Sequence, residues 1–455
     1  MMKVRSQSAW AIFVFLCVLG SVHANQLRIA TFAVDASPPI GSPLAYDPTE
    51  GVESPLSIKG VVLLGSGEPI VLCAVDWIGI GNAGYDAFRQ AFANAAGTTP
   101  ERVALHCLHQ HDAPVCDFSV HEILAPIGIA DQFSDVAFCR SVMERTAHAI
   151  QQCLETAQPI THIGHGQGKI EKVASNRRIL GEDGRVEFVR YTATVDPNIR
   201  AKPVGTIDPM VKLISFWNGE GPVAVLSYYA THPQSYYRTK LANTDFPGMA
   251  RNARESETNV PHIHFNGAGG NIGAGKWNDG SPANRQVLAD RVHAGMLAAW
   301  KATTKAPLQA DDVHWQTLAV ALPVKTQHSL DKTKQLIADE TVPMLQRQLM
   351  ATDLAWAQRS ADGHQIDLSC LSLGNNRILH MPGELFVEYQ LAAQAMRPDL
   401  FVAMAAYGDY APGYIGTKIA YSQGGYETEP RSSRVSSDVE DVLMRSMRTL
   451  LDANE

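Results

Sequence analysis

Strand-like and helix-like segments alternate along almost the whole of this chain, and this alternation limits the folds that it can adopt. Apolar runs such as 60–80, 103–109 and 366–379 are typical of buried strands. Longer amphipathic runs between them, such as 85–96 and 135–156, are typical of helices. We therefore expect an α/β fold in which mixed β-sheets are covered by helices.

The second half of the chain continues this pattern. Residues 211–217 and 223–229 flank Asn-Gly-Glu-Gly and predict a β-hairpin. Helices are expected at 284–301, 330–350 and 435–451, and the more polar segment 302–365 is expected to be an insertion or cap. No repeat and no clear linker divides the chain. We therefore expect residues 25–455 to form a single large domain.

The first 24 residues have the features of a cleavable secretory signal. Lys3 and Arg5 precede the apolar stretch 9–19, and Val22-His23-Ala24 offers small residues for cleavage. The apolar stretch is too short to span a bilayer comfortably. We expect residues 1–24 to be removed as a signal peptide and the remaining chain to be secreted or periplasmic.

The charge and the cysteines restrict the partners and the cross-links. The formal net charge is −8, so no basic face is expected and nucleic acid is excluded as a partner. Export permits disulfides, but the sequence does not choose among the pairings of the six cysteines that follow the signal. A bridge between Cys107 and Cys116 is one option. A zinc site made of these two cysteines and two histidines is another.

Two histidines, His109 and His111, follow the strand predicted over 103–109. Alternate residues of an extended strand point to the same face, so we expect both imidazoles to reach one point. Two neutral imidazoles on one face are the start of a zinc site. The alternative is a pair of structural histidines at the end of a strand.

Other reactive side chains stand at the ends of predicted elements. His232 follows an apolar strand, and Asp245 behind it is a candidate for orienting a ligand or capping a helix. Glu384 begins a helix after a Pro-Gly turn, where a carboxylate is also favourable for the helix itself. Tyrosines cluster near Tyr414. The glycine-rich loop 266–275 lacks the Gly-Lys-Ser/Thr ending of a phosphate-binding loop.

Taken in order, these segments resemble the motifs of the neutral/alkaline (non-lysosomal) ceramidases, which are secreted or membrane-facing zinc amidases that cleave ceramide. The His-Thr-His-Ser-Gly-Pro motif of that family is similar to residues 109–114, and its Val-His-Pro-Thr-Ser motif is similar to 231–235. Its Pro-Gly-Glu and Tyr-Ile-Thr-Thr motifs are similar to 382–384 and 414–417. The resemblance covers roughly residues 27–430.

The resemblance implies a zinc site whose ligands are His109, His232, Glu384 and Tyr414. It also implies that His111 is a catalytic acid/base beside the metal and that Tyr414 helps to stabilise an oxyanion. Zinc lowers the pKa of a coordinated water molecule toward ~7. We therefore expect a catalytic domain that hydrolyses the amide bond of an N-acyl lipid or a related acylated amine. No organic cofactor is expected.

The chain departs from the family in one loop. Where the ceramidases have Gly-Asp-Val-Ser-Pro-Asn, this chain has residues 270–275, so Gly273 replaces the serine implicated in ceramidase catalysis. We also expect no C-terminal immunoglobulin-like domain of the kind that the family carries. These departures predict a divergent member with a changed substrate, for which transient contact with a membrane surface is an option. The alternatives are a zinc esterase and a non-catalytic exported zinc-binding protein.

Overall fold

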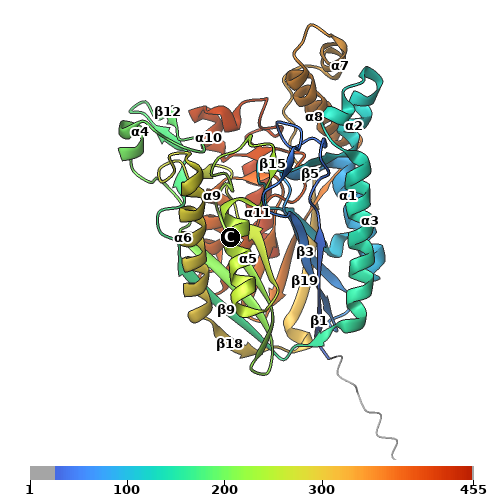
Figure 1. Cartoon of the computed structure of the whole chain (residues 1–455), viewed down its shortest axis with the longest axis vertical. Coiled ribbons are helices and arrows are strands. Elements are labelled where there is room, and N and C mark those ends of the chain that lie inside the picture. The colour runs from blue at the N-terminus through green and yellow to red at the C-terminus, as the bar shows by residue number, and fades with distance from the viewer. Residues whose placement is uncertain (1–25, 453–455) are drawn as a thin grey trace, which may run out of the picture.

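The computed structural model describes residues 26–452, so the predicted signal peptide, 1–24, lies outside the described part of the chain. Three sheets of four or five strands form the centre of the molecule. Each of them contains one parallel pair among antiparallel pairs. Figure 1 shows helices on the outer sides of these sheets. The expected α/β fold, with mixed sheets covered by helices, is therefore confirmed.

The first sheet has the strand order β6-β4-β3-β1-β8. Its strands are β1 (Arg28–Asp35), β3 (Ser57–Leu64), β4 (Ile70–Val75), β6 (Val103–Cys107) and β8 (Gln158–Pro159). Helices α1 (Asn82–Ala96) and α3 (Val136–Cys153) pack on its outer face. Because β4 is buried along its whole length, its sequence is a continuous apolar run instead of an alternating one.

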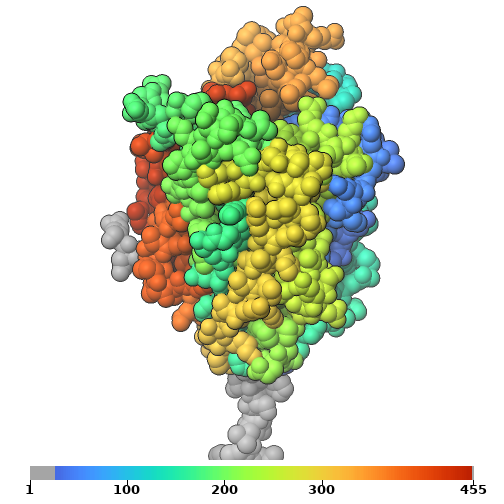
Figure 2. Space-filling model, turned by 60° about the vertical axis from the view of Figure 1, so that its left-hand side comes forward, coloured from blue at the N-terminus to red at the C-terminus, as the bar shows by residue number. Residues whose placement is uncertain are grey.

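The second sheet has the order β16-β14-β13-β9-β18. Its strands are β9 (His162–Lys169), β13 (Met210–Asn218), β14 (Gly221–Tyr229), β16 (His262–Asn266) and β18 (Thr304–Pro307). Strands β13 and β14 form the predicted hairpin. Helices α5 (Asp245–Thr258) and α6 (Pro282–Lys301) cover the outer face of this sheet, and Figure 2 shows this side of the molecule with α6 in yellow on the surface.

The third sheet has the order β19-β20-β21-β23. Its strands are β19 (Val313–Val320), β20 (Ile366–Leu373), β21 (Asn376–His380) and β23 (Phe401–Ala405). Helices α9 (Val387–Met396) and α11 (Val439–Leu450) pack against it. Helix α11 is the closing helix that was expected over 435–451, and it starts four residues later.

The inner faces of the three sheets share one apolar core. Leu72 of β4, Ile214 of β13 and Ile378 of β21 are fully buried in this core. Burial of each such side chain contributes roughly 1.5–3 kcal/mol to folding. The carboxyl ends of strands from all three sheets are thereby held in fixed positions relative to one another.

Shorter elements connect the sheets. The short helices are α2 (Phe118–Leu124), α4 (Pro197–Ala201), α10 (Lys418–Gln423) and six 3₁₀ turns (Pro100–Arg102, Ala125–Ile127, Ala130–Gln132, Leu154–Thr156, Ala310–Asp312 and Tyr426–Thr428). The short strands are β2 (Gly51–Val52), β5 (Gly79–Gly81), β7 (Val115–Asp117), β10 (Ser175–Asn176), β11 (Arg178–Leu180), β12 (Val186–Val189), β15 (Leu241–Ala242), β17 (Ile272–Gly273), β22 (Glu384–Leu385) and β24 (Tyr414–Ile415).

The segment 302–365 differs from the expectation of a helical insertion. It supplies β18 and β19 to two of the sheets, and only α7 (Leu330–Ala338) and α8 (Met344–Ala361) project, beside α2 at the top of Figure 1. The single helix predicted over 330–350 is wrong, because Pro343 lacks the N–H that a continuous helix needs and instead precedes α8.

Two further expectations concern cysteines and membrane spans. The six cysteines between residues 26 and 452 are buried and unpaired, so Cys107 and Cys116 form no bridge. The group of side chains within the described residues that could hold a metal ion contains histidines and no cysteine, so the mixed cysteine and histidine site is not formed either. Within residues 26–452, no helix has the length and apolarity that crossing a membrane requires.

Candidate metal centre

Loops from three different sheets converge at one end of the shared core. His109 and His111 follow β6 of the first sheet, and His232 follows β14 of the second. Glu384 begins β22, shortly after β21 of the third sheet. Side chains at such strand ends are held by a rigid scaffold but remain accessible to a ligand, which is where functional residues commonly lie.

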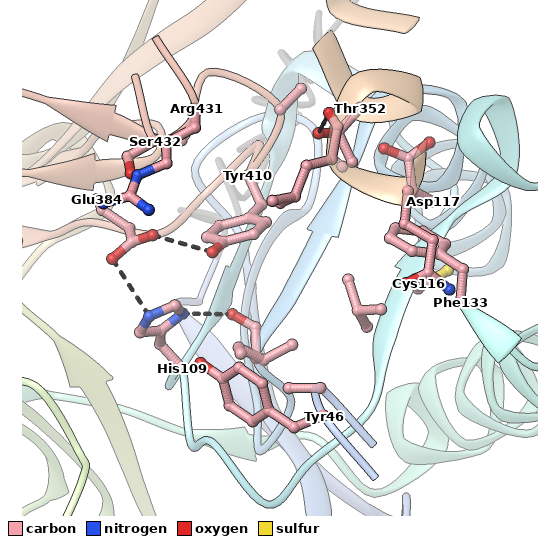
Figure 3. Close-up of a pocket in the computed structure, with 18 of the residues that line it drawn as sticks. Tyr46, His109, Cys116, Asp117, Phe133, Thr352, Glu384, Tyr410, Arg431 and Ser432 are labelled. Carbon is pink, nitrogen blue, oxygen red and sulfur yellow. Dashed lines mark hydrogen bonds and ion pairs between the residues drawn. The ribbon is translucent and has the colours of Figure 1, made fainter. Parts of the chain in front are cut away.

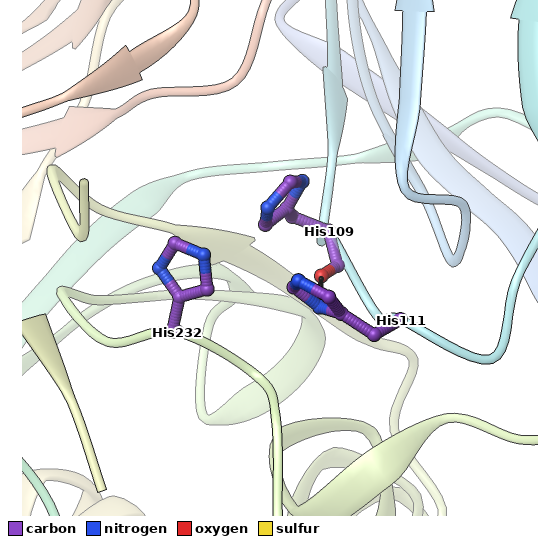
Figure 4. Close-up of side chains that lie close together, drawn as sticks. All are labelled: His109, His111 and His232. Atoms are coloured by element: carbon purple, nitrogen blue, oxygen red, sulfur yellow. Dashed lines mark hydrogen bonds between the residues drawn. The ribbon is translucent and has the colours of Figure 1, made fainter. Parts of the chain in front are cut away.

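The three imidazoles lie close together, and the carboxylate of Glu384 contacts two of them. One ligand atom from each of His109, His111 and His232 lies within 4.8 Å of the others, and Figure 4 shows the three rings grouped around a common point. The Glu384 Oε2 atom lies 3.2 Å from His109 Nε2 and 3.4 Å from His232 Nε2. All four side chains are buried.

Backbone carbonyl groups fix the tautomer of each histidine. The Nδ1 atoms of His109, His232 and His111 lie 2.7, 3.0 and 3.1 Å from the carbonyl oxygens of Ile78, Gly269 and His109. A carbonyl only accepts hydrogen bonds, so each Nδ1 carries a hydrogen, and Nε2 is the nitrogen that has the lone pair in the neutral form of each ring. This arrangement is typical of histidines that bind a metal through Nε2.

The cluster passes a test of fit for a divalent cation. His232 Nε2 and Glu384 Oε2 are buried without a hydrogen-bond partner, which is costly for polar atoms. Burial lowers the pKa of His232 well below its ordinary value and keeps the imidazole neutral. Burial alone would raise the pKa of Glu384, but His109, Arg177 and Tyr410 bring it below its ordinary value. Neutral imidazoles with an ionised carboxylate form a donor set that zinc accepts.

The histidines converge for a different reason from the one expected. Strand β6 ends at Cys107, and His109 has a left-handed φ of +71°, so the pair does not project from an extended strand. Gln110 between them is fully buried and donates to Asp76 Oδ1 at 3.2 Å and to the Thr244 carbonyl at 3.3 Å. This anchor turns both imidazoles toward the same side of the loop.

The Asp76 carboxylate that accepts from Gln110 also forms a buried ion pair. Arg251 of α5 donates to both carboxylate oxygens of Asp76 at 2.7 and 2.9 Å. Ser57 also donates to Asp76 through its backbone N–H and its hydroxyl. The pair joins the first sheet to the helix that covers the second. It therefore couples the position of the histidine loop to the packing of the two sheets.

Tyr414 lies beside the cluster. It is the direct partner of Glu384 in the parallel pair of β22 and β24, and its ring is stacked on His232 with the centroids 6.3 Å apart. Its hydroxyl accepts from Arg177 Nη2 at 3.2 Å and lies 3.4 Å from the Tyr426 hydroxyl. Burial raises the pKa of Tyr414 well above its ordinary value, so the hydroxyl is neutral. Its role as a ligand stays a prediction.

Two residues at the centre were not identified from the sequence. Arg177 is buried next to Tyr414, donates to the Gly270 carbonyl and lies 3.7 Å from a Glu427 oxygen. Tyr410 donates to Glu384 Oε1 at 2.9 Å. An arginine after a short strand is ordinarily solvated, so nothing local in the sequence predicts that Arg177 is buried.

The glycine-rich loop and Asp245 support the neighbouring segments. A Cβ on Gly269 would lie 2.7 Å from the Thr231 carbonyl oxygen, so this loop packs against protein backbone, and its Gly269 carbonyl orients His232. A Cβ on Gly273 would lie 3.2 Å from the Arg177 side chain. Asp245 accepts from the Ser235 N–H at 2.9 Å and thereby holds the loop that follows His232.

A pocket of about 330 Å³ adjoins the centre (Figure 3). His109, His111, Glu384 and Tyr414 line it, together with apolar side chains from several loops and from α8. Such a pocket can bring an organic molecule to the histidine cluster.

The fold of this chain is similar to that of known structures. No protein-family model matches the chain, and no curated protein matches its sequence. The neutral ceramidase from Pseudomonas aeruginosa has a similar structure, with a TM-score of 0.66, 15% identity, and coverage of 94% of this chain and 74% of that one. A ceramidase complexed with C2 gives a TM-score of 0.66, 14% identity, and coverage of 94% and 75%. The chain therefore has the fold of the neutral ceramidase structures.

Proposed function

We propose that this chain is a divergent ceramidase-like hydrolase that binds zinc and cleaves the amide bond of an N-acyl lipid or a related acylated amine. The observation that carries the proposal is the convergence of His109, His111, His232 and Glu384 from three sheets. The likeness to ceramidase structures supports the same class of reaction. The unpartnered His232 Nε2 and Glu384 Oε2 support a metal between them.

We assign His109, His232, Glu384 and Tyr414 as the zinc ligands. The contacts of Glu384 Oε2 with both imidazoles support the first three, and the pairing of Tyr414 with Glu384 supports the fourth. A set made of the three histidines is the alternative, because His111 belongs to the same cluster.

When bound, a zinc ion lowers the pKa of a water molecule and polarises the carbonyl group of the substrate. Burial lowers the pKa of His111 well below its ordinary value, so the imidazole is neutral. Because its Nδ1 hydrogen is directed at the His109 carbonyl, Nε2 is the atom that would accept the proton of the attacking water. His111 then delivers that proton to the amide nitrogen as the C–N bond breaks, which yields a carboxylic acid and an amine. Arg177 donates to the Tyr414 hydroxyl and holds it beside the centre, where Tyr414 would help to stabilise the developing oxyanion.

Metal analysis combined with an activity screen tests this proposal. Purified protein is expected to contain about one zinc ion per chain, and His109→Ala and His232→Ala are expected to lose it. His121→Ala is the matched control, because His121 lies in α2 outside the cluster. N-acyl amides and esters are then assayed with and without a chelator. Activity without metal contradicts the proposal, activity on esters alone favours the esterase, and zinc without turnover favours the binding protein.

The variant His111→Ala separates the two ligand sets. If His111 is the acid/base, the variant keeps its zinc and loses turnover by about 10²–10⁴-fold. If His111 is a ligand, the variant loses its zinc. Unchanged turnover would contradict both roles.

We also propose that the protein acts outside the cytoplasm, since its first 24 residues match a cleavable secretory signal. Mass spectrometry of the exported protein should give an N-terminus at Asn25. An intact N-terminus on a cytoplasmic protein would contradict this proposal.

A further inference from the structure

The pocket beside the metal centre has an exposed rim and a buried inner wall. Leu345 and Tyr46 on the rim are 59% and 45% exposed, whereas Asn82 and Asp117 on the wall are 1% and 5% exposed. In Figure 3, Asp117 lies across the pocket from His109. The volume of about 330 Å³ is at the lower end of the ~300–1,000 Å³ that is usual for pockets holding drug-sized ligands.

Asp117 on this wall is a buried carboxyl group without a cationic partner. Its oxygens accept from the Val120 N–H at 3.1 Å and from Asn82 Nδ2 at 2.6 Å. None of the ion pairs formed by residues 26–452 includes it. Burial, with a smaller contribution from Asp409, raises the pKa of Asp117 to about 7 against the lowering effect of its hydrogen bonds to Asn82 and Val120. Each carboxyl oxygen can accept more than one hydrogen bond, so Asp117 has acceptor capacity left.

Asn82 adds a second acceptor to the same wall. It begins α1 with a left-handed φ of +50°, and its backbone N–H donates to Asp409 Oδ1 at 3.2 Å. Its Nδ2 is used by Asp117, but its Oδ1 is buried without a hydrogen-bond partner. A buried acceptor of this kind is costly unless a donor reaches it.

We propose that this inner wall is a substrate subsite in which Asn82 and Asp117 accept hydrogen bonds from a hydroxyl or ammonium group. This inference rests on the proposed amidase function and narrows its substrate. The substrate is a compact acylated amine that carries a polar donor group away from the amide being cleaved. A lipid with two unsubstituted alkyl chains leaves Asn82 Oδ1 without a donor and is a poor substrate.

Matched substrates and one isosteric variant test the subsite. Coumarin amides of straight-chain acids are prepared in three series, in which the far end of the acyl chain is a methyl, a hydroxyl or an ammonium group. We expect the purified, zinc-loaded protein to hydrolyse one of the two donor-ended series with a kcat/KM about 10- to 100-fold above that of the methyl series of equal length. The hydroxyl and ammonium series show which donor the site takes.

The variant Asp117→Asn removes the carboxylate but keeps the side-chain cap of α2, because asparagine is an equally good N-cap. We expect it to lose most of the preference for donor-ended chains, so that its kcat/KM for these chains falls to within a few-fold of its own value for the methyl series. Asp196→Asn makes the same change at the N-cap of α4, which does not line the pocket, and should keep the full preference.

The possible outcomes separate the subsite from the reaction. Equal kcat/KM values for the three series in the unaltered protein overturn the subsite but leave the amidase intact. A preference that survives in Asp117→Asn also overturns it. If the protein hydrolyses none of the amides, the amidase is contradicted, and calorimetric Kd values for the same amides then test the subsite. Tighter binding of donor-ended amides that is lost in Asp117→Asn supports it, and equal binding overturns it.

Discussion

Replacing Arg251 with methionine should destabilise the protein strongly, because it leaves the Asp76 carboxylate buried without its partner. Asp76 is fully buried and Arg251 is 1% exposed, and the pair is bidentate at 2.7 and 2.9 Å. Breaking a buried ion pair on one side typically costs about 3–5 kcal/mol. The two Ser57 hydrogen bonds to Asp76 remain, so we expect a value near the lower end of that range.

The dependence on pH gives this prediction a second check. Burial alone would raise the pKa of Asp76, but Arg251 and Ser57 lower it below its ordinary value. The pair therefore stabilises the folded chain above the unfolded pKa of about 3.9, and this stability is lost as the pH falls through the folded pKa. In Arg251→Met the effect of burial dominates and raises the pKa of Asp76. The difference in the free energy of unfolding between the unaltered protein and the variant should then become smaller as the pH falls and Asp76 becomes protonated.

Urea unfolding at neutral pH and near pH ~4 measures both effects, since the change in the free energy of unfolding comes from the transition midpoint and its slope. Arg238→Met is the control, because Arg238 forms its ion pair with Asp47 in solvent and should change little. If Arg251→Met lowers the free energy of unfolding by less than about 1 kcal/mol, or by the same amount at the two pH values, the reasoning is refuted.

Three further predictions concern the metal centre and the core. Tyr410→Phe removes the hydrogen bond to Glu384 Oε1 and should weaken zinc binding about 10–100-fold in a competition with a chelator; an unchanged affinity would show that Tyr410 does not hold the carboxylate. Removing zinc with a chelator should lower Tm, and adding zinc back should restore it, because a ligand that binds only the folded state stabilises that state. Phe88→Ala, on the buried face of α1, should cost about 3–5 kcal/mol in urea unfolding, whereas Ile40→Ala, at a position 79% exposed, should cost less than about 0.5 kcal/mol; equal effects would contradict the core assignment.

The architecture was predictable from local patterns. Strands buried on both faces, such as β4, carry continuous apolar runs, and the hairpin of β13 and β14 is marked by its Asn-Gly-Glu-Gly turn. Helix boundaries were less predictable. The periodicity over 330–350 is helical throughout, but Pro343 divides it into α7 and α8.

The convergence at the centre was predictable only in part. The motifs that resemble ceramidases identify His109, His232 and Glu384, which do come together. The left-handed turn at His109 could not be foreseen, because it depends on Gln110 reaching a buried Asp76 that lies far away in the sequence. Arg177 was missed for the same reason, since its partners belong to segments more than 90 residues away.

Helix α8 bears on how the substrate range of this fold can change. Ala351 and Leu354 of α8 pack in a small cluster with α2 and α7, apart from the core shared by the three sheets. Leu345 and Leu349 of the same helix line the pocket, whereas the side chains of the candidate metal centre come from segments that the three sheets position. Mutations in α8 that arise during evolution can therefore change which molecules enter the pocket without changing the side chains of the candidate metal centre. Homologues that act on different substrates should differ first in this helix.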